Sequence, residues 1–269
     1  VDAVSDTTAY ILSIGNGPAS RIYKTEDGGQ TWTLQFQNED PKAFFDAMAI
    51  STLCRDTALS VSGDARCAMF RTIDGGRTWT PVPPASLPPA LDNEGAFAAS
   101  GTNVAVFGKA HVWIGTGAAA RSRVLHSADA GRTWTVADTP LATGPSTGIF
   151  SIAFRDARHG IVVGGDYTRE HEAADNAART SDGGRTWTLV TGLGGYRSVV
   201  AHLGANRGAQ LWMAVGPSGS DISVDDGKTW RPYGSLGFDT IGVAKGHNRT
   251  ALSVFGAGAN GRLGRLEIE

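Results

Sequence analysis

The sequence is short of the features that mark redox, membrane and nucleic-acid proteins. Its 269 residues include only 2 cysteines, and no apolar stretch approaches the roughly 18 residues that span a bilayer. The formal net charge is −2, and no run of lysine and arginine offers a footprint for nucleic acid or an anionic membrane. The 6 histidines lack the close spacing of a metal site. We therefore expect no cofactor, no metal site, no nucleic-acid partner and no membrane span.

Glycine, by contrast, is abundant. The chain has 36 glycines, with 41% hydrophobic and 19% charged residues. So many glycines indicate tight turns between short strands and exclude a helix bundle, while the hydrophobic fraction suffices for a core. No stretch has the composition of a linker, so the sequence predicts a single domain over residues 1–269.

One eight-residue pattern returns five times, with the consensus Ser/Thr-x-Asp-x-Gly-x-Thr-Trp. Its tryptophans lie roughly 43 to 55 residues apart, a period that suits four short strands with their turns, as in a propeller blade. The aspartates and tryptophans of these five boxes are Asp27, Trp32, Asp74, Trp79, Asp129, Trp134, Asp182, Trp187, Asp225 and Trp230.

A structural role explains the boxes best. The aspartate carboxylate accepts hydrogen bonds from turn amides, glycine supplies a positive φ, and Thr-Trp favours the strand that follows. A catalytic constellation is not normally repeated at five equivalent positions, so no chemistry is assigned to these residues.

The segments between the boxes repeat as well. Each unit has an apolar strand, a second strand ending in glycine, a polar loop, and a third strand that runs into the box. The clearest units predict strands at 45–50, 58–63, 68–72 and 78–82, at 149–154, 160–164, 177–180 and 186–190, and at 198–203, 211–216, 221–224 and 229–233. A sixth unit without a box predicts strands at 240–244, 251–256 and 262–268, the third has an extra strand-like piece at 103–108, and the first has only 1–4 for its innermost strand.

The sequence thus predicts an all-β propeller of four-stranded antiparallel blades, with six blades in this chain. The incomplete first and last units favour ring closure by pairing of the two chain ends, which removes exposed sheet edges. The alternative is a seventh blade, missing upstream of this chain. The start at Val1, without a methionine, fits removal of a signal peptide or a start inside a longer protein.

The five boxes resemble Asp-box, or BNR, repeats. Their arrangement resembles the sialidase-like propellers, and especially the photosystem II stability/assembly factor-like proteins. The segments outside the boxes that share this likeness are 13–25, 41–48, 148–156, 164–167 and 215–221. The resemblance implies a binding or assembly scaffold, often exported. We therefore expect a periplasmic or secreted monomer that binds a protein partner or a small ligand such as a glycan.

Polar and aromatic residues gather on one predicted face. In a propeller, the loops between blades and those between second and third strands surround the central pocket, whereas the box turns lie on the other face. The residues placed near that mouth are Asn16, Lys42, Phe45, Asp46, Asp64, Arg66, Asp166, Tyr167, Arg169, Glu170, Tyr196, Arg197, Ser218, Ser220 and Asp221. Such a mouth is the default place for a ligand, and the longest loop, 166–176, is the candidate lid or specificity loop.

An enzyme is the alternative. The carboxylates, tyrosine and arginine that a sialidase-like glycoside hydrolase or lyase needs would come from Asp46, Asp166, Glu170, Tyr196 and Arg197. A hydrolase also predicts two carboxyl groups about 5 to 10 Å apart across the central pocket. The sialidase Arg-Ile-Pro signature is absent. The leading prediction is therefore a non-catalytic binding or assembly module, with an exported glycoside hydrolase or lyase as the alternative.

The two cysteines are expected to be free thiols. Cys54 and Cys67 should lie at opposite ends of neighbouring strands. A strand of about six residues separates its ends by roughly 20 Å, which is far beyond the reach of a disulfide.

Overall fold

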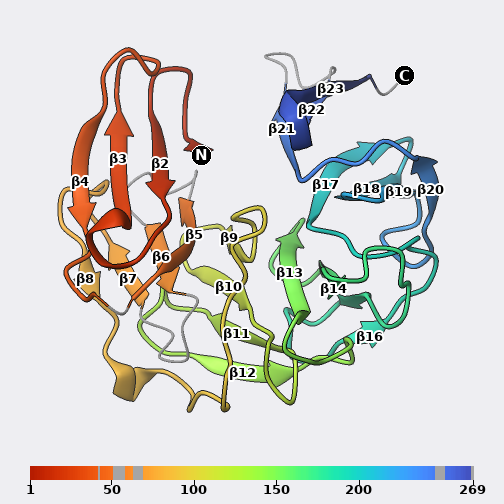
Figure 1. Ribbon diagram of the computed structural model, residues 1–269, viewed down its shortest axis with the longest axis horizontal. Helices are drawn as coiled ribbons and strands as arrows, with labels where there is room; N and C mark the ends of the chain where they lie inside the picture. Colours follow the sequence, from red (N-terminus) through yellow and green to blue (C-terminus); the bar gives the residue numbers. More distant parts are fainter. Residues whose placement is uncertain (42, 51–57, 63–68, 246–251, 268–269) are drawn as a thin grey trace.

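The protein is a ring of small antiparallel sheets around a central axis (Figure 1). The computed structural model describes residues 1–41, 43–50, 58–62, 69–245 and 252–267. Five sheets have four strands each and are called blades 1 to 5 here; the last, the C-terminal sheet, has three strands. In every sheet, strands that are consecutive in the chain pair with one another. No helix in this part of the chain is long and apolar enough to cross a membrane.

The strands follow the predicted units closely. Blade 1 contains β1 (Asp2–Ala3), β2 (Ala9–Ser13), β3 (Arg21–Thr25) and β4 (Thr33–Gln37). Blade 2 contains β5 (Phe45–Ile50), β6 (Ala58–Ser62), β7 (Met69–Thr72) and β8 (Thr80–Pro81). Blade 3 contains β9 (Val104–Phe107), β10 (His111–Gly115), β11 (Arg123–Ser127) and β12 (Thr135–Asp138). Blade 4 contains β13 (Thr147–Phe154), β14 (Gly160–Asp166), β15 (Ala177–Thr180) and β16 (Thr188–Leu189). Blade 5 contains β17 (Val199–Asn206), β18 (Ala209–Gly216), β19 (Gly219–Ser223) and β20 (Arg231–Gly234). The C-terminal sheet contains β21 (Thr240–Lys245), β22 (Leu252–Gly258) and β23 (Arg262–Glu267).

The prediction of an all-β propeller with four-stranded antiparallel blades is confirmed, but the number of blades is wrong. The structure has five four-stranded blades, not six or seven, because the sixth unit forms only the three-stranded C-terminal sheet. In blades 1 to 5 a box turns the third strand back into the fourth, and the sixth unit has no box. The piece at 103–108, expected as an extra strand, is instead the first strand of blade 3, β9.

The expected pairing of the two chain ends is not seen among the described residues. The strand β1 pairs with β2, and among the described residues β23 pairs only with β22. Blade 1 and the C-terminal sheet lie on either side of an interruption in the ring (Figure 1). Hydrophobic clusters join each sheet to the next along the chain, but none of the described clusters joins the C-terminal sheet to blade 1.

Each box closes its turn with the same set of hydrogen bonds. In the fourth box, the Asp182 carboxylate accepts the backbone amide of Thr186 at 3.0 Å, its hydroxyl at 2.6 Å and the Thr180 hydroxyl at 2.8 Å. The same three contacts recur in the other four boxes. The structural interpretation of the boxes therefore accounts for their aspartates and threonines without invoking chemistry.

The box tryptophans have a second role, between blades. Each of Trp79, Trp134, Trp187 and Trp230 packs into the hydrophobic cluster that joins its own blade to the preceding one. Trp32 belongs to blade 1, which has no sheet packed in front of it, and its exposed fraction is 37%. The box thus contributes both the turn within a blade and an apolar contact to its neighbour.

Acid should destabilise the fold over the range in which the box carboxylates titrate. Hydrogen bonds from Thr31 and Thr78 lower the pKa values of Asp27 and Asp74 to about 2. An unfolded aspartate titrates near pH 3.9, so these bonds stabilise the folded state above that pH and are lost as the pH falls toward 2. Burial raises the pKa of Asp2, and this shift favours the folded state as the pH falls. It concerns a single carboxyl group, whereas the box aspartates contribute several shifts of the opposite sign.

The measurement is urea unfolding between pH 5 and pH 2. We expect the free energy of unfolding to fall over this range, and to fall less in Asp74→Asn, which keeps the shape of the side chain and removes its titration. A flat profile, or the same loss in the variant, would show that the box carboxylates do not set the acid stability.

Candidate functional site

Three segments meet at the mouth beside blades 4 and 5. The backbone oxygen of Glu170, in the loop that follows β14, accepts the amide of Tyr196 at 2.9 Å and the Ser218 hydroxyl at 2.9 Å. Tyr196 lies in the connection between the two blades, and Ser218 lies in the turn between β18 and β19. These contacts place blade connections and second-to-third-strand loops on one face here, as the sequence predicted.

The carboxylate of Asp166 organises the start of the long loop. It accepts the Thr168 hydroxyl at 2.7 Å, the Thr168 amide at 2.9 Å and the Arg169 guanidinium at 2.9 Å. These bonds, the Thr168 hydroxyl above all, hold the pKa of Asp166 well below its usual range. Asp166 therefore stays ionised, and it is suited to fixing the loop rather than to donating a proton.

Arg197 is committed to a buried ion pair. Its Nε donates to Asp221 Oδ2 at 2.6 Å, and one of its terminal nitrogens donates to the Tyr196 backbone oxygen at 2.8 Å and to the Ser218 hydroxyl at 3.0 Å. The side chains of Arg197 and Asp221 are only 3% and 1% exposed. Arg197 was predicted as a ligand contact, but the structure places it beneath the mouth surface, where it joins the segments together.

Tyr196 is likewise buried. Its ring packs edge-to-face against Phe150, with ring centroids 4.8 Å apart. Burial, helped by the nearby carboxylates of Asp239 and Glu170, raises the pKa of the Tyr196 phenol above its usual range. A tyrosine in this environment is a poor nucleophile, because it loses its proton less readily than a free phenol.

An aromatic cluster with one exposed member lies at the mouth. The rings of Phe97 and Phe150 stack at 4.0 Å, and Tyr167 approaches both edge-to-face at 6.4 and 6.0 Å. Phe150 is buried, whereas Tyr167 is 49% exposed. Tyr167 was predicted from the sequence, whereas Phe97 was not, because it lies between Pro89 and β9, outside every predicted strand.

The remaining predicted residues do not all reach the same place. Phe45 is fully buried among Phe36 and Phe70, so it is a core residue and the prediction of a ligand contact is not supported by its position. Asn16 is exposed and bridges to Phe44, and Ser220 lies in a separate pocket between blade 5 and the C-terminal sheet. The predictions for Lys42, Asp64, Arg66, Cys54 and Cys67 lie outside the described residues.

A cavity of about 630 Å³ lies between the first strands of several sheets. Two acidic residues line it, the predicted Asp46 and also Asp2, which the sequence analysis treated only as part of a short strand. Asp2 accepts the Ile50 amide at 2.6 Å, which ties β1 to β5, and burial raises the pKa of its carboxyl. The cavity therefore holds two carboxyl groups that are separate from those of the mouth loops.

Hydroxyl groups connect the blades beside this cavity. The Thr102 hydroxyl lies 2.6 Å from that of Ser100 and 2.7 Å from that of Ser151, and the Ser100 hydroxyl donates to the backbone oxygen of Ser198 at 2.8 Å. This chain of bonds joins the entrance of blade 3 to the first strand of blade 4 and the entrance of blade 5. Among the described residues, no cluster of three or more histidines, cysteines and acids is placed to hold a metal ion.

Comparison with known proteins shows the fold. No family model and no curated protein matches the sequence. The structure is similar to that of YCF48 bound to a D1 peptide, with a TM-score of 0.59 and 14% identity over 99% of this chain and 76% of that one. It is also similar to the GH74 enzyme of Niastella koreensis, with a TM-score of 0.64 and 16% identity over 96% of this chain and 40% of that one. The chain therefore shares a β-propeller fold with these proteins.

A third similarity widens the range of functions that share this architecture. The major allergen Mala s 1 of Malassezia sympodialis matches with a TM-score of 0.56 and 11% identity, over 98% of this chain and 92% of that one. At such low identities the likeness is one of fold alone. A binding protein and a glycoside hydrolase are both compatible with this fold. The two functions can be distinguished only by the residues of the site.

Breaking the Arg197–Asp221 pair should cost much more stability than breaking an exposed pair. We expect Arg197→Met to lower the free energy of unfolding by about 3 to 5 kcal/mol, because it leaves the Asp221 carboxylate buried without its partner. Arg197→Met/Asp221→Leu should recover most of this loss, since both charges are then removed. The matched control is Arg169→Met, which should lower the free energy of unfolding far less, because the Arg169 side chain is 61% exposed. Equal losses in both single variants, measured by urea unfolding, would contradict the structural role of Arg197.

Proposed function

We propose that this protein is a non-catalytic binding and assembly module of the photosystem II assembly factor-like type, which holds a segment of a protein partner at its mouth. The observation that carries the proposal is the exposed ring of Tyr167 on the Phe97–Phe150 stack, beside charged groups that are already bonded to one another. An exposed aromatic ring with a rigid base is the kind of residue that dominates binding energy at protein interfaces.

The state of the charged residues supports binding over chemistry. Arg169 pairs with both Asp166 and Glu172, at 2.9 Å in each case, and Arg197 pairs with Asp221. A general acid or a substrate-binding arginine needs a free proton or a free donor at the surface, whereas these groups satisfy one another. They order the loop around Tyr167 and so present its ring in one position.

The comparison with YCF48 supports a peptide as the ligand. That protein shares the fold and was solved with a D1 peptide bound. For the present chain, an extended peptide suits a mouth with one aromatic anchor and short polar turns, because main-chain groups of the peptide can bond to the turns while one side chain packs on Tyr167.

Removal of the Tyr167 ring should abolish most of the peptide binding. Peptides selected from a random phage library on the purified protein should bind Tyr167→Ala at least about tenfold more weakly, the loss typical of a central aromatic contact. The matched control is Tyr23→Ala, a partly buried tyrosine in β3 of blade 1, outside the mouth, which should bind the selected peptides as the parent protein does. Selected peptides that bind both variants equally would contradict a site at Tyr167.

A hydrolase is the second candidate, on one specific observation. Asp2 and Asp46 line the same central cavity, and the pKa of Asp2 is raised, as expected of a general acid. Because β1 is short and its Asp2 carboxylate also accepts the Ile50 amide, we favour a structural role for that group.

The two functions differ in turnover. With the binding function we expect no reducing sugar above background from a panel of plant and bacterial polysaccharides incubated with the purified protein. Turnover that disappears in Asp46→Asn, while the variant keeps the melting temperature of the parent protein, would contradict the proposal and establish the hydrolase.

A further inference from the structure

One hydroxyl group at the mouth is buried without a hydrogen-bond partner. Tyr196 is 3% exposed, and its phenol makes no hydrogen bond within the part of the chain that the structure describes. By contrast, the equally buried Tyr10 donates its hydroxyl to the Gly75 oxygen at 2.8 Å. The Tyr196 ring is covered, yet its hydroxyl oxygen retains some accessible surface. Folded proteins rarely leave a buried polar group unpaired, so this hydroxyl is suited to a ligand.

Two carboxyl groups surround the Tyr196 hydroxyl. Burial is the main cause that raises the pKa of the Tyr196 phenol, and the nearby carboxylates of Asp239 and Glu170 raise it further. Tyr196 therefore stays protonated. Both acidic residues are partly buried, and neither forms an ion pair with another described residue. Two carboxylates without a counter-charge beside a neutral hydroxyl favour a positively charged ligand group.

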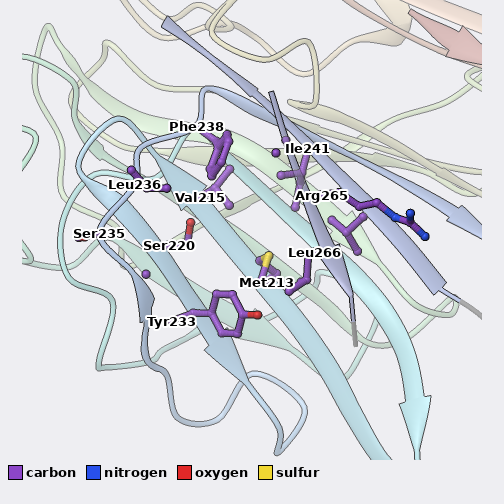
Figure 2. A pocket seen from close by; sticks show the side chains of 14 residues that line it. Met213, Val215, Ser220, Tyr233, Ser235, Leu236, Phe238, Ile241, Arg265 and Leu266 are labelled. Carbon is purple, nitrogen blue, oxygen red and sulfur yellow. The ribbon is translucent and has the colours of Figure 1, made fainter. Parts of the chain in front are cut away.

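Asp239 is held beside Tyr196 by the connection between blade 5 and the C-terminal sheet. Its backbone oxygen accepts the Ser198 hydroxyl at 2.8 Å. The preceding residue, Phe238, lines an apolar pocket of about 460 Å³ between the two sheets (Figure 2). The Phe238 amide donates to the Gly216 oxygen at 3.1 Å, and a Cβ added at Gly216 would clash with the Tyr196 backbone oxygen. Packing on both sides thus fixes where the Asp239 carboxylate lies.

The arginines of this part of the mouth are already engaged. The long loop, residues 166–176, has four acidic residues and one arginine. That arginine, Arg169, pairs with two of the loop acids, and Arg197 pairs with Asp221 beneath the surface. The mouth therefore has an excess of negative charge around Glu170, which attracts a cationic segment and repels an acidic one.

The exposed ring of Tyr167 selects an arginine as that cation. Tyr167 and Tyr196 pack against the same Phe150 ring, with centroid distances of 6.0 and 4.8 Å, so the exposed ring and the unpaired hydroxyl lie at one place. A guanidinium stacks flat on an aromatic face while its N–H groups reach acceptors at its edge. The hydroxyl oxygen and the carboxylates are such acceptors, whereas an ammonium group lacks the planar fork of donors.

We propose that the partner segment at the mouth presents an arginine side chain, which stacks on Tyr167 and donates to the Tyr196 hydroxyl. The same guanidinium pairs with the carboxylates of Glu170 and Asp239. This inference rests on the function proposed above, because it names the chemistry of the segment that the mouth holds. The partner is then a protein with an exposed, extended segment that contains arginine.

The probe is the tightest-binding peptide selected on the purified protein from the random phage library. We expect it to contain an arginine, and fluorescein anisotropy of the synthetic peptide gives its Kd. Citrulline in place of that arginine keeps the shape and removes the charge, and it should weaken binding by about tenfold or more. Lysine keeps the charge without the planar fork, and it should weaken binding by about threefold or more.

Matched variants of the protein locate the arginine. Tyr196→Phe removes only the hydroxyl; it should weaken the arginine peptide by about fivefold or more without lowering the melting temperature, because that hydroxyl bonds nothing in the free protein. Glu170→Gln and Asp239→Asn should each weaken the arginine peptide by about fivefold or more, but change binding of the citrulline peptide by less than about twofold. The control Glu39→Gln removes an exposed carboxylate between blades 1 and 2 and should bind both peptides as the parent protein does.

The possible results separate this inference from the function on which it rests. Selected peptides that require Tyr167 but lack arginine, or that bind equally well with citrulline, would overturn the inference and leave the peptide-binding function intact. An arginine peptide that binds Tyr196→Phe, Glu170→Gln and Asp239→Asn as it binds the parent protein would also overturn it. A library that yields no Tyr167-dependent peptide would contradict both.

Discussion

The contact between each box tryptophan and the preceding blade is the interaction on which this structure depends. A four-stranded sheet of such short strands buries too little surface to be stable alone, so each blade needs an apolar neighbour on both faces. The box places a large aromatic ring at that contact from a turn that its own aspartate holds rigid. These contacts determine how the blades are arranged around the central axis. They therefore also determine the position of every loop at the mouth.

The same constraint explains where the ring is incomplete. The C-terminal sheet contributes no tryptophan to blade 5, and blade 1 has no sheet in front of Trp32. The apolar pocket between blade 5 and the C-terminal sheet also lies at this end of the chain. Blades 4 and 5, which come just before the C-terminal sheet, pack against each other through Trp230 and carry the ordered mouth around Tyr167. The packed blades thus support the mouth around Tyr167, and the apolar pocket lies beside the three-stranded C-terminal sheet.

The repeat made most of the fold predictable from sequence, but not the number of complete blades. Asp182 and its four counterparts identify the turns directly, because only a local set of bonds is involved. The sixth unit was counted as a blade by analogy, although only three strands were predicted for it and no box was present to turn the third strand back. At the site, Tyr167 was identified from its loop. The burial of Arg197 was not predicted, because the sequence around a loop arginine does not show that it forms an ion pair with Asp221. Asp2 was missed for the same reason: its role depends on β5, which is distant in sequence.

The most direct test of this account is native-state hydrogen exchange, followed strand by strand in the isolated protein. Blade packing through the tryptophans predicts the slowest exchange in β14 and β18, which are covered on both faces, and the fastest in blade 1 and the C-terminal sheet, which border the interruption. Protection of β23 equal to that of β18 would contradict the account, because it would mean that the ring is closed.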